Sequence, residues 1–161
     1  MHKHRIRCVG IVLQDDKILM VLHKHLKEEK YWLMPPGGGL LEGETLYEGA
    51  VREVFEETRL ETEPVRIIYV RQFLEDERNY QNLEVYVLLR RLGGVLKRGT
   101  DPEETVQYIQ SAGFYNRQEL EDSQLTIHPA ILLDQFWQDA RDEFPVDRLY
   151  LGMTTIEEEK R

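Results

Sequence analysis

Residues 38–60 read GGLLEGETLYEGAVREVFEETRL, and this stretch decides the fold. It begins in a glycine-rich turn and continues as apolar and acidic residues at helical spacing. Glu53, Glu56 and Glu57 stand at positions i, i+3 and i+4, so one helix face carries all three. Because like charges at this spacing destabilise a bare helix, we expect the three carboxylates to share a cation. Oxygen-only ligands suit hard ions, with Mg²⁺ first and Mn²⁺ as a substitute.

The same stretch predicts where its helix begins and what it packs against. Thr45 and Glu48 form a Thr-x-x-Glu capping box, in which each side chain satisfies a free backbone N–H of the other residue. We therefore expect a helix over residues 45–58. Its apolar side chains cover a continuous arc, so one face packs on a sheet and the other faces a cleft. The residues of that arc are Tyr47, Ala50, Val51, Val54 and Phe55.

The spacing of the fixed residues resembles the signature of the Nudix hydrolases. That signature is Gly, five residues, Glu, seven residues, and then Arg-Glu-apolar-any-Glu-Glu-any-Gly-apolar. The preceding residues 32–38, WLMPPGG, are also similar to the family's approach to this box. One position departs from the pattern, because Arg59 stands where the family has glycine. The matching residues are Gly38, Glu44, Arg52, Glu53, Val54, Glu56, Glu57 and Leu60.

The resemblance implies an α/β (α+β) fold, a Nudix-type α/β/α sandwich with a mixed β-sheet between helices. It also implies that Glu53, Glu56 and Glu57 are catalytic and hold divalent ions that bridge a diphosphate. The backbone carbonyl of Gly37 would complete the metal shell, and Glu53 is in addition a candidate for the base that activates water. Metal ions suit this chemistry because they offset the charge of the substrate and lower the pKa of bound water.

Other residues would support the site. By resemblance, Gly38, Glu44 and Arg52 have structural roles: Glu44 holds the loop against the helix start, and Arg52 fixes a neighbouring glutamate. The alternative for the acidic face is a solvated helix surface that pairs with its own arginines. Family members often draw one more carboxylate from a loop far downstream, and the alternative there is a loop that is merely polar. The candidates in this chain are Asp101, Glu103 and Glu104.

Arg59 raises a question about how the helix ends. A glycine after a helix usually adopts the left-handed conformation that lets the chain turn. We expect Arg59 to adopt the same conformation, with its side chain toward solvent. The strain is about 1 kcal/mol, and a positive charge near the helix C-terminus offsets part of it.

The rest of the chain predicts one domain over residues 1–150, followed by a frayed acidic tail over residues 151–161. Residues 5–13 and 17–23 indicate a hairpin, since both are rich in apolar and β-branched residues and polar residues separate them. Apolar residues at helical spacing predict a helix over residues 127–144. Further strands are expected at residues 31–34, 65–74, 83–92 and 106–115.

Composition limits the function classes. The chain has 161 residues, a net charge of −9 and 41% hydrophobic residues, which suit a soluble globular domain. The negative charge argues against a binder of duplex nucleic acid or of anionic membranes. Cys8 is the single cysteine, so no internal disulfide forms, and a buried inert thiol is expected. With no membrane-span pattern and no signal-peptide pattern, we expect a cytoplasmic protein.

These observations predict a Mg²⁺-dependent pyrophosphohydrolase of the Nudix type. Its substrate would be a nucleoside diphosphate linked to another moiety, as in ADP-ribose, a nucleotide sugar or a dinucleotide. The alternatives are a nucleoside triphosphate pyrophosphohydrolase, a non-catalytic nucleotide-binding or regulatory Nudix domain, and a Ca²⁺-binding domain. A homodimer is left open. Residues that would recognise a base or sugar, with core packing as the alternative, are Arg5, Arg7, Tyr31, Phe73, Tyr80 and Phe114.

Overall fold

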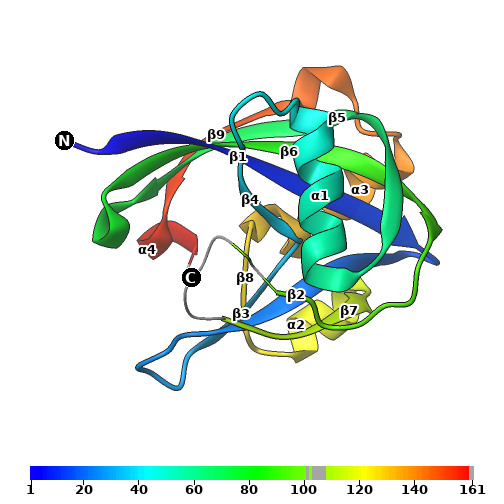
Figure 1. The fold of residues 1–161 in the computed structure, drawn as a ribbon, viewed down its shortest axis with the longest axis horizontal. Coiled ribbons are helices and arrows are strands. Elements are labelled where there is room, and N and C mark those ends of the chain that lie inside the picture. Colours follow the sequence, from blue (N-terminus) through cyan, green and yellow to red (C-terminus); the bar gives the residue numbers. More distant parts are fainter. Residues whose placement is uncertain (101, 103–107, 160–161) are drawn as a thin grey trace.

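The computed structural model describes residues 1–100, 102 and 108–159. Over this part the chain folds into nine strands and four α-helices, joined by loops and short 3₁₀ turns (Figure 1). The strands are β1 (Lys3–Gln14), β2 (Lys17–Lys24), β3 (Tyr31–Met34), β4 (Gly37–Gly39), β5 (Glu61–Glu75), β6 (Tyr80–Gly93), β7 (Ile109–Tyr115), β8 (Thr126–Ile127) and β9 (Tyr150–Thr155). The helices are α1 (Leu46–Thr58), α2 (Arg117–Asp122), α3 (Phe136–Arg141) and α4 (Ile156–Glu159), and the 3₁₀ turns are η1 (Asp76–Arg78), η2 (Ala130–Leu133) and η3 (Val146–Arg148).

The strands form a mixed sheet in the order β8-β3-β2-β1-β6-β5-β9, with β4 on β1 and β7 on β2. The pairs β1–β6, β5–β9 and β3–β8 are parallel, and the other pairs are antiparallel. The predicted hairpin is present, but β1 and β2 pair only at Leu13↔Ile18 and Gln14↔Lys17. Beyond those two pairs the strands diverge, so β1 carries one sheet (β4, β1, β6, β5 and β9) and β2 carries another (β7, β2, β3 and β8).

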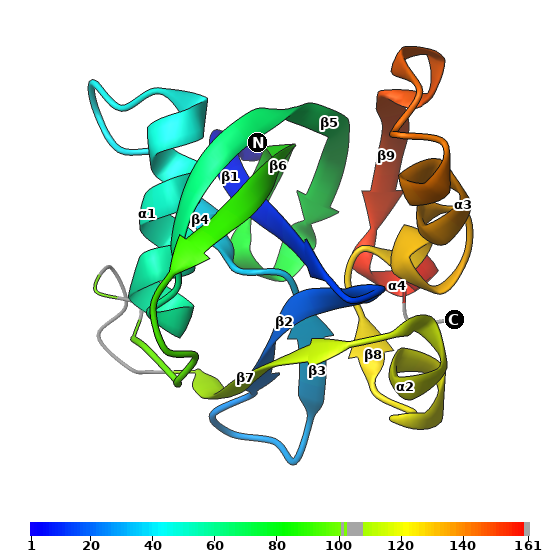
Figure 2. The same ribbon diagram turned by 90° about the vertical axis from the view of Figure 1, so that its right-hand side faces the viewer.

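Helices lie on both sides of the strands, as the sandwich prediction requires. Figure 2 shows α1 on one side of β1, β5 and β6, with α3 on the opposite side. One buried cluster, which includes Cys8, Val54 and Val87, joins α1 to the first sheet. A second cluster fills the space between the two sheets and α3, and it includes Tyr69 and Phe136. The mixed-sheet α+β architecture is therefore confirmed.

Helix α1 begins and ends as its sequence indicates. Thr45 is the N-cap, and both hydrogen bonds of its capping box with Glu48 are present. At the other end Arg59 has φ 65° and ψ 10°, the expected left-handed conformation. Its guanidinium lies over the exposed ring of Phe55, 5.4 Å from the ring centre, and so does not simply point to solvent. Under the helix the thiol of Cys8 is buried, and burial raises its pKa to about 11, which suits an inert group.

The prediction of one helix over residues 127–144 is wrong. Within that range Ile127 belongs to β8, a 3₁₀ turn covers Ala130–Leu133, and α3 covers only Phe136–Arg141. The apolar residues at helical spacing do reach the core, but side-chain hydrogen bonds fix a different backbone path. Trp137 donates from Nε1 to the carbonyl of Leu132 at 2.8 Å, and the buried Asp139 accepts from the hydroxyl of Tyr69 at 2.5 Å.

The prediction of a frayed tail is also wrong for residues 151–159. Residues 150–155 form strand β9, which pairs in parallel with β5, so the sheet extends past the predicted domain end at residue 150. Helix α4 follows, and its Glu159 is buried in contact with Arg71 and His128. These partners lie far away in the sequence, so composition alone could not show them. Among the described residues, no helix has both the length and the apolar character needed to cross a membrane.

Candidate functional site

The three predicted glutamates project from α1 into different surroundings. The Glu53 side chain is fully buried and that of Glu57 is 2% exposed, whereas the side chain of Glu56 is 21% exposed. Ionised carboxylates are rarely buried unless an opposite charge, hydrogen bonds or a cation compensates for lost hydration. The acidic face is therefore not the solvated helix surface considered as the alternative.

Strand β4 lies against these glutamates and explains two of the glycines. A Cβ atom built on Gly38 would lie 2.4 Å from Oε1 of Glu53, so only a glycine lets the carboxylate rest against this backbone. The neighbouring Gly37 donates its N–H to Oε1 of Glu57 at 3.2 Å. The glycine-rich turn thus contacts two of the three carboxylates directly.

Arg52 connects the glutamates to the loop before α1. Its Nε and Nη2 bind the two carboxylate oxygens of Glu44 at 2.6 and 3.0 Å, and Nη2 also donates to the carbonyl of Gly39 at 3.0 Å. Its Nη1 donates to Oε1 of Glu53 at 2.8 Å and to Oε2 of Glu56 at 3.1 Å. A planar guanidinium presents several donors in fixed directions, which suits this role.

The pairing between Arg52 and Glu44 shifts both pKa values. The hydrogen bond to Glu44 raises the pKa of Arg52 against the opposing effect of burial. The same hydrogen bond lowers the pKa of Glu44, and a further bond from the N–H of Leu41 adds to the effect. Glu44 is therefore ionised at neutral pH and joins residues 41–44 to the helix through Arg52.

The oxygen atoms of the acidic face of α1 bear on the predicted metal site. Among the described residues, no group of three or more His, Cys, Asp or Glu side chains is arranged to hold a metal ion directly. The chemistry of the donors nevertheless fits a hard cation, because all of them are carboxylate oxygens. Glu44, Glu53 and Glu56 bind the guanidinium of Arg52, and Glu57 projects from the same helix toward Gly37, so these five side chains carry a formal charge of −3. Bound cations would offset that surplus.

The predicted downstream carboxylates Asp101, Glu103 and Glu104 lie outside the described residues. The segment before them is described, and it reaches the C-terminal end of α1. Gly99 donates its N–H to the carbonyl of Glu57 at 2.7 Å, and Thr100 donates to that of Glu56 at 3.0 Å. A Cβ atom at Gly99 would overlap the carbonyl of Glu56 at 1.7 Å, so this close approach requires glycine. The chain therefore enters the predicted carboxylate loop beside the glutamate helix.

A second charged cluster, which sequence reasoning missed, lies on the face of β1, β5 and β6 that is turned away from α1. Arg71 binds Glu84 through Nε and Nη2 at 2.9 and 2.8 Å, and Nε of Arg7 lies 3.5 Å from the same carboxylate. Arg71 also contacts Glu159, which in turn contacts Nδ1 of His128. The side chains of Arg71, Glu84 and Glu159 are at most 5% exposed. The signal that could have revealed this cluster is the presence of charged residues within apolar strands.

Of the six residues considered for base or sugar recognition, two lie at this cluster and two more pair with each other. Arg7 belongs to it, the ring of Phe73 lies 4.8 Å from the guanidinium of Arg71, and Arg5 stacks over Tyr80 at 5.0 Å. Tyr31 instead pairs with Lys24 at the surface, and Phe114 packs against the core under α1.

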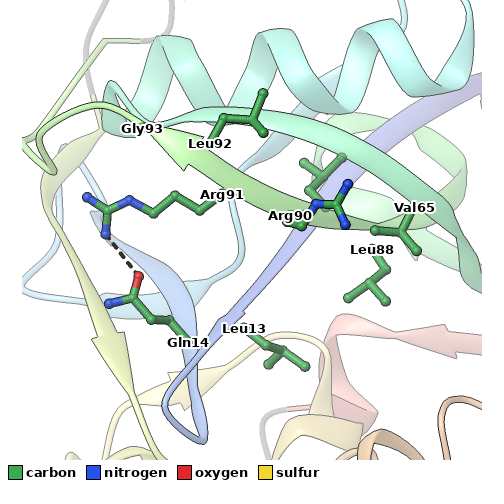
Figure 3. Close-up of a pocket in the computed structure, with 9 residues that line it drawn as sticks. Leu13, Gln14, Val65, Leu88, Arg90, Arg91, Leu92 and Gly93 are labelled. Atoms are coloured by element: carbon green, nitrogen blue, oxygen red, sulfur yellow. Dashed lines mark hydrogen bonds between the residues drawn. The ribbon is translucent and has the colours of Figure 1, made fainter.

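An open pocket lies elsewhere in the molecule. It has a volume of about 660 Å³ and lies between the end of β1 and the strands β5 and β6 (Figure 3). Arg91 donates to Gln14 across its mouth at 2.9 Å. None of the residues predicted for the site lines it, so it contributes nothing to the chemistry of the glutamates.

Comparison with known proteins identifies relatives of this chain. Residues 4–136 match the NUDIX domain. The chain is 34% identical over 105 residues to the 8-oxo-dGDP phosphatase NUDT18 of Mus musculus, covering 65% of this chain and 29% of that protein. It is 32% identical over 96 residues to the ADP-ribose pyrophosphatase of Methanocaldococcus jannaschii, covering 59% of this chain and 56% of that protein. The matches thus span less than two thirds of either curated relative.

Solved structures agree with this result at the level of the fold. A NUDIX hydrolase from Nitrosomonas europaea superposes with a TM-score of 0.70 at 16% identity, covering 96% of this chain and 81% of that one. An ADP-ribose pyrophosphatase from Streptococcus suis superposes with a TM-score of 0.61 at 20% identity, covering 92% and 97%. The domain match covers most of the chain, and the sequence box and the fold agree with it. The chain therefore belongs to the Nudix family.

Proposed function

We propose that this protein is a Mg²⁺-dependent hydrolase that cleaves the diphosphate bond of a nucleoside diphosphate linked to another moiety. The contact between α1 and β4 supports this proposal most directly. There Glu53 lies against Gly38, Glu57 accepts from the N–H of Gly37, and Arg52 binds Glu53 and Glu56. A buried acidic cluster of this kind, built on the Nudix box, suits a polyphosphate substrate that arrives with cations.

The residues that would hold Mg²⁺, with Mn²⁺ as a substitute, are Glu53, Glu56 and Glu57 together with the carbonyl of Gly37. Members of this family generally use divalent metals. Bound metal supplies two effects, neutralising the charge on the diphosphate and lowering the pKa of a water molecule. The formal charge of −3 on the glutamate and arginine cluster provides the reason for a cation to bind here.

The side chains of the protein have distinct roles in the proposed reaction. Glu53 accepts a proton from the attacking water, and its hydrogen bond from Arg52 favours the ionised carboxylate that this role needs. Arg52 and Glu44 act as positioning residues, because they fix Glu53 relative to β4. The water oxygen bonds to one phosphorus as the bond from that phosphorus to the bridging oxygen breaks. For ADP-ribose the products are AMP and ribose 5-phosphate.

The relatives suggest which substrates to compare first. The archaeal relative is an ADP-ribose pyrophosphatase, which favours ADP-ribose among the linked diphosphates. The mouse relative is an 8-oxo-dGDP phosphatase, which favours an oxidised nucleoside diphosphate as the second candidate. A nucleoside triphosphate and a non-catalytic binding domain remain as the further alternatives.

A substrate panel tests this proposal. ADP-ribose, a nucleotide sugar, a dinucleotide, 8-oxo-dGDP and a nucleoside triphosphate are each incubated with the protein in EDTA, then with Mg²⁺ and with Mn²⁺. For ADP-ribose, the nucleotide sugar and the dinucleotide, phosphate that appears only after an added phosphatase reports cleavage, because the phosphatase does not attack a diphosphate that is esterified at both ends. For 8-oxo-dGDP and the nucleoside triphosphate no phosphatase is added, and direct release of phosphate or of pyrophosphate reports cleavage. Undiminished turnover in EDTA contradicts the metal requirement. Failure on all substrates with metal present favours the binding domain.

A further inference from the structure

The two sheets separate as they leave the hairpin, and a charged contact joins them again at the open end. Arg71 lies on β5 of the first sheet, and His128 follows β8 of the second sheet. The carboxylate of Glu159 contacts both of them, with Oε1 on Arg71 and Oε2 on Nδ1 of His128. One carboxylate from α4 thus bridges the two sheets, and Figure 2 shows α4 after β9 and toward β8.

The group of side chains around this carboxylate is basic once Glu159 is left out. Arg7 and Arg71 contribute two positive charges against the single negative charge of Glu84, and the ring of His128 adds a donor. The side chains of Arg7 and Arg71 are 14% and 5% exposed, so these two positive charges need a second anion besides Glu84. Thr154 adds a hydroxyl within 3.2 Å of Nη1 of Arg71. Glu159 supplies the missing anion and brings the formal charge of these residues to zero.

Glu159 and the side chains that surround its carboxylate come from different parts of the chain. Arg7, Arg71, Glu84 and His128 all fall within the NUDIX match at residues 4–136, whereas Glu159 lies beyond it. Helix α4 has four residues, too few to be stable without its packing contacts. The anion is therefore carried by a short element attached to the domain through β9, and its release would disturb little of the core.

Strand β1 connects these side chains to strand β4, which contacts the glutamates of α1. Burial opposes the charge of Arg7, but Glu84, with Glu57 among more distant groups, raises its pKa overall. β1 also carries Arg7 directly opposite Gly39 of β4, whose carbonyl accepts from Arg52. Arg7 therefore contacts Glu84 of the second cluster from a strand that pairs with the turn beside the glutamates.

We propose that Arg71 and His128 form an anion-binding subsite between the two sheets, and that Glu159 blocks it as a built-in competitor. A phosphate or carboxylate group of a small molecule displaces Glu159 and takes over its contacts. That this small molecule is the substrate rests on the proposed function; a separate anion that acts as an effector would use the same chemistry. A site that is open for only a fraction of the time binds more weakly by that fraction.

Binding of AMP and of inorganic phosphate in EDTA, measured by calorimetry, tests the subsite without turnover. Glu159→Gln removes the competing charge, and we expect AMP to bind at least about tenfold more tightly, which corresponds to a site closed about nine tenths of the time. Glu157→Gln is the matched control, because it removes the same charge from an exposed position of α4 and should change nothing. Tighter binding of AMP alone identifies a nucleotide ligand, and tighter binding of phosphate as well identifies a general anion site.

Equal affinities in wild type and Glu159→Gln, or no binding to either protein, would overturn the inference. If the variant melts too low for use, the ring resonances of His128 in the wild-type protein report the same exchange. They should shift when AMP binds, and binding that leaves them in place refutes displacement. If Glu159→Gln binds AMP more tightly but the protein hydrolyses no substrate, the proposed function is contradicted and the subsite is supported. If the protein hydrolyses a substrate but the variant binds AMP no more tightly, only the subsite is contradicted.

Discussion

Replacement of Gly38 by alanine is the sharpest test of the packing between β4 and the glutamate helix. The added Cβ atom would lie 2.4 Å from Oε1 and 2.7 Å from Cδ of Glu53, whereas ordinary contacts begin at 3.4 Å. The carboxylate must therefore move by about 1 Å, and Arg52, which holds it at 2.8 Å, resists the movement. A displacement of about 1 Å in a catalytic group costs on the order of 10²-fold in rate. We expect Gly38→Ala to lose activity by about that factor.

Gly39→Ala is the matched control, since it changes the next residue of the same strand. No atom lies within 4 Å of a Cβ built at Gly39, and its φ lies outside the left-handed region. The change should leave activity unaltered and stabilise the fold by about 0.4–1 kcal/mol, because alanine reduces the freedom of the unfolded chain. Both variants are assayed with the best substrate of the panel at saturating Mg²⁺, with melting curves to establish folding. Equal rates in the two variants would refute the argument that Gly38 positions Glu53.

Four other predictions follow from the same contacts. Glu53→Gln keeps the shape but removes a charge that accepts a proton or binds metal, so kcat should fall at least about 10²-fold; a folded variant with wild-type kcat would exclude this role. Mg²⁺ that binds the folded protein should raise its melting temperature above the value in EDTA, because binding relieves the repulsion among the glutamates of the native state. A melting curve that does not move with Mg²⁺ means that the folded protein has no site for it in the concentration range measured. Arg52 lowers the pKa of Glu44 in the folded protein, so the contribution of this pair to stability is present above the ordinary carboxyl pKa of about 4.3 and is lost as pH falls through the folded-state pKa of Glu44. In denaturant melts the stability difference between wild type and Glu44→Gln should therefore shrink toward low pH. A difference that stays constant with pH contradicts the pairing. Arg59→Gly relieves left-handed strain but removes a contact with the Phe55 ring, and each effect is worth about 1 kcal/mol or less. We expect the variant to be neutral or more stable by up to about 1 kcal/mol. A loss of stability of more than about 1 kcal/mol in denaturant melts would reveal a further contact of Arg59.

The parts of the fold that could be predicted are those whose causes are local. Thr45 and Glu48 satisfy each other's backbone within one turn, so the start of α1 was readable from four residues. The left-handed conformation at Arg59 follows equally from its place after the helix. The range 127–144 failed because its backbone path depends on distant partners. Tyr69, on β5, holds Asp139 across 70 residues of sequence, and no local pattern encodes such a bond.

The same distinction applies to the site. That one helix carries Glu53, Glu56 and Glu57 could be predicted, because the spacing that places them together is local. The contacts of these glutamates with β4 and Arg52 could not be predicted, because a local sequence pattern does not show how closely a strand approaches the helix. The second charged cluster was visible only in part. Arg71 and Glu84 stand out within apolar strands, but their partner Glu159 is 88 residues from Arg71 and carried no signal of its own.

The two charged clusters favour ligands of opposite charge. The cluster around Arg52 has a formal charge of −3 and favours cations, whereas the cluster around Arg71 is positive without Glu159 and favours an anion. A neutral molecule would satisfy neither. A phosphorylated molecule that arrives with divalent metal would satisfy both, because under the proposed function its diphosphate would bind cations at the glutamates, and a second anionic group would replace Glu159. A ligand that reaches both clusters should therefore break the contacts of Glu159 with Arg71 and His128. A ligand that binds only at the glutamates should leave these contacts in place. The length of the ligand between its anionic groups, and not its base alone, would then determine whether it displaces Glu159.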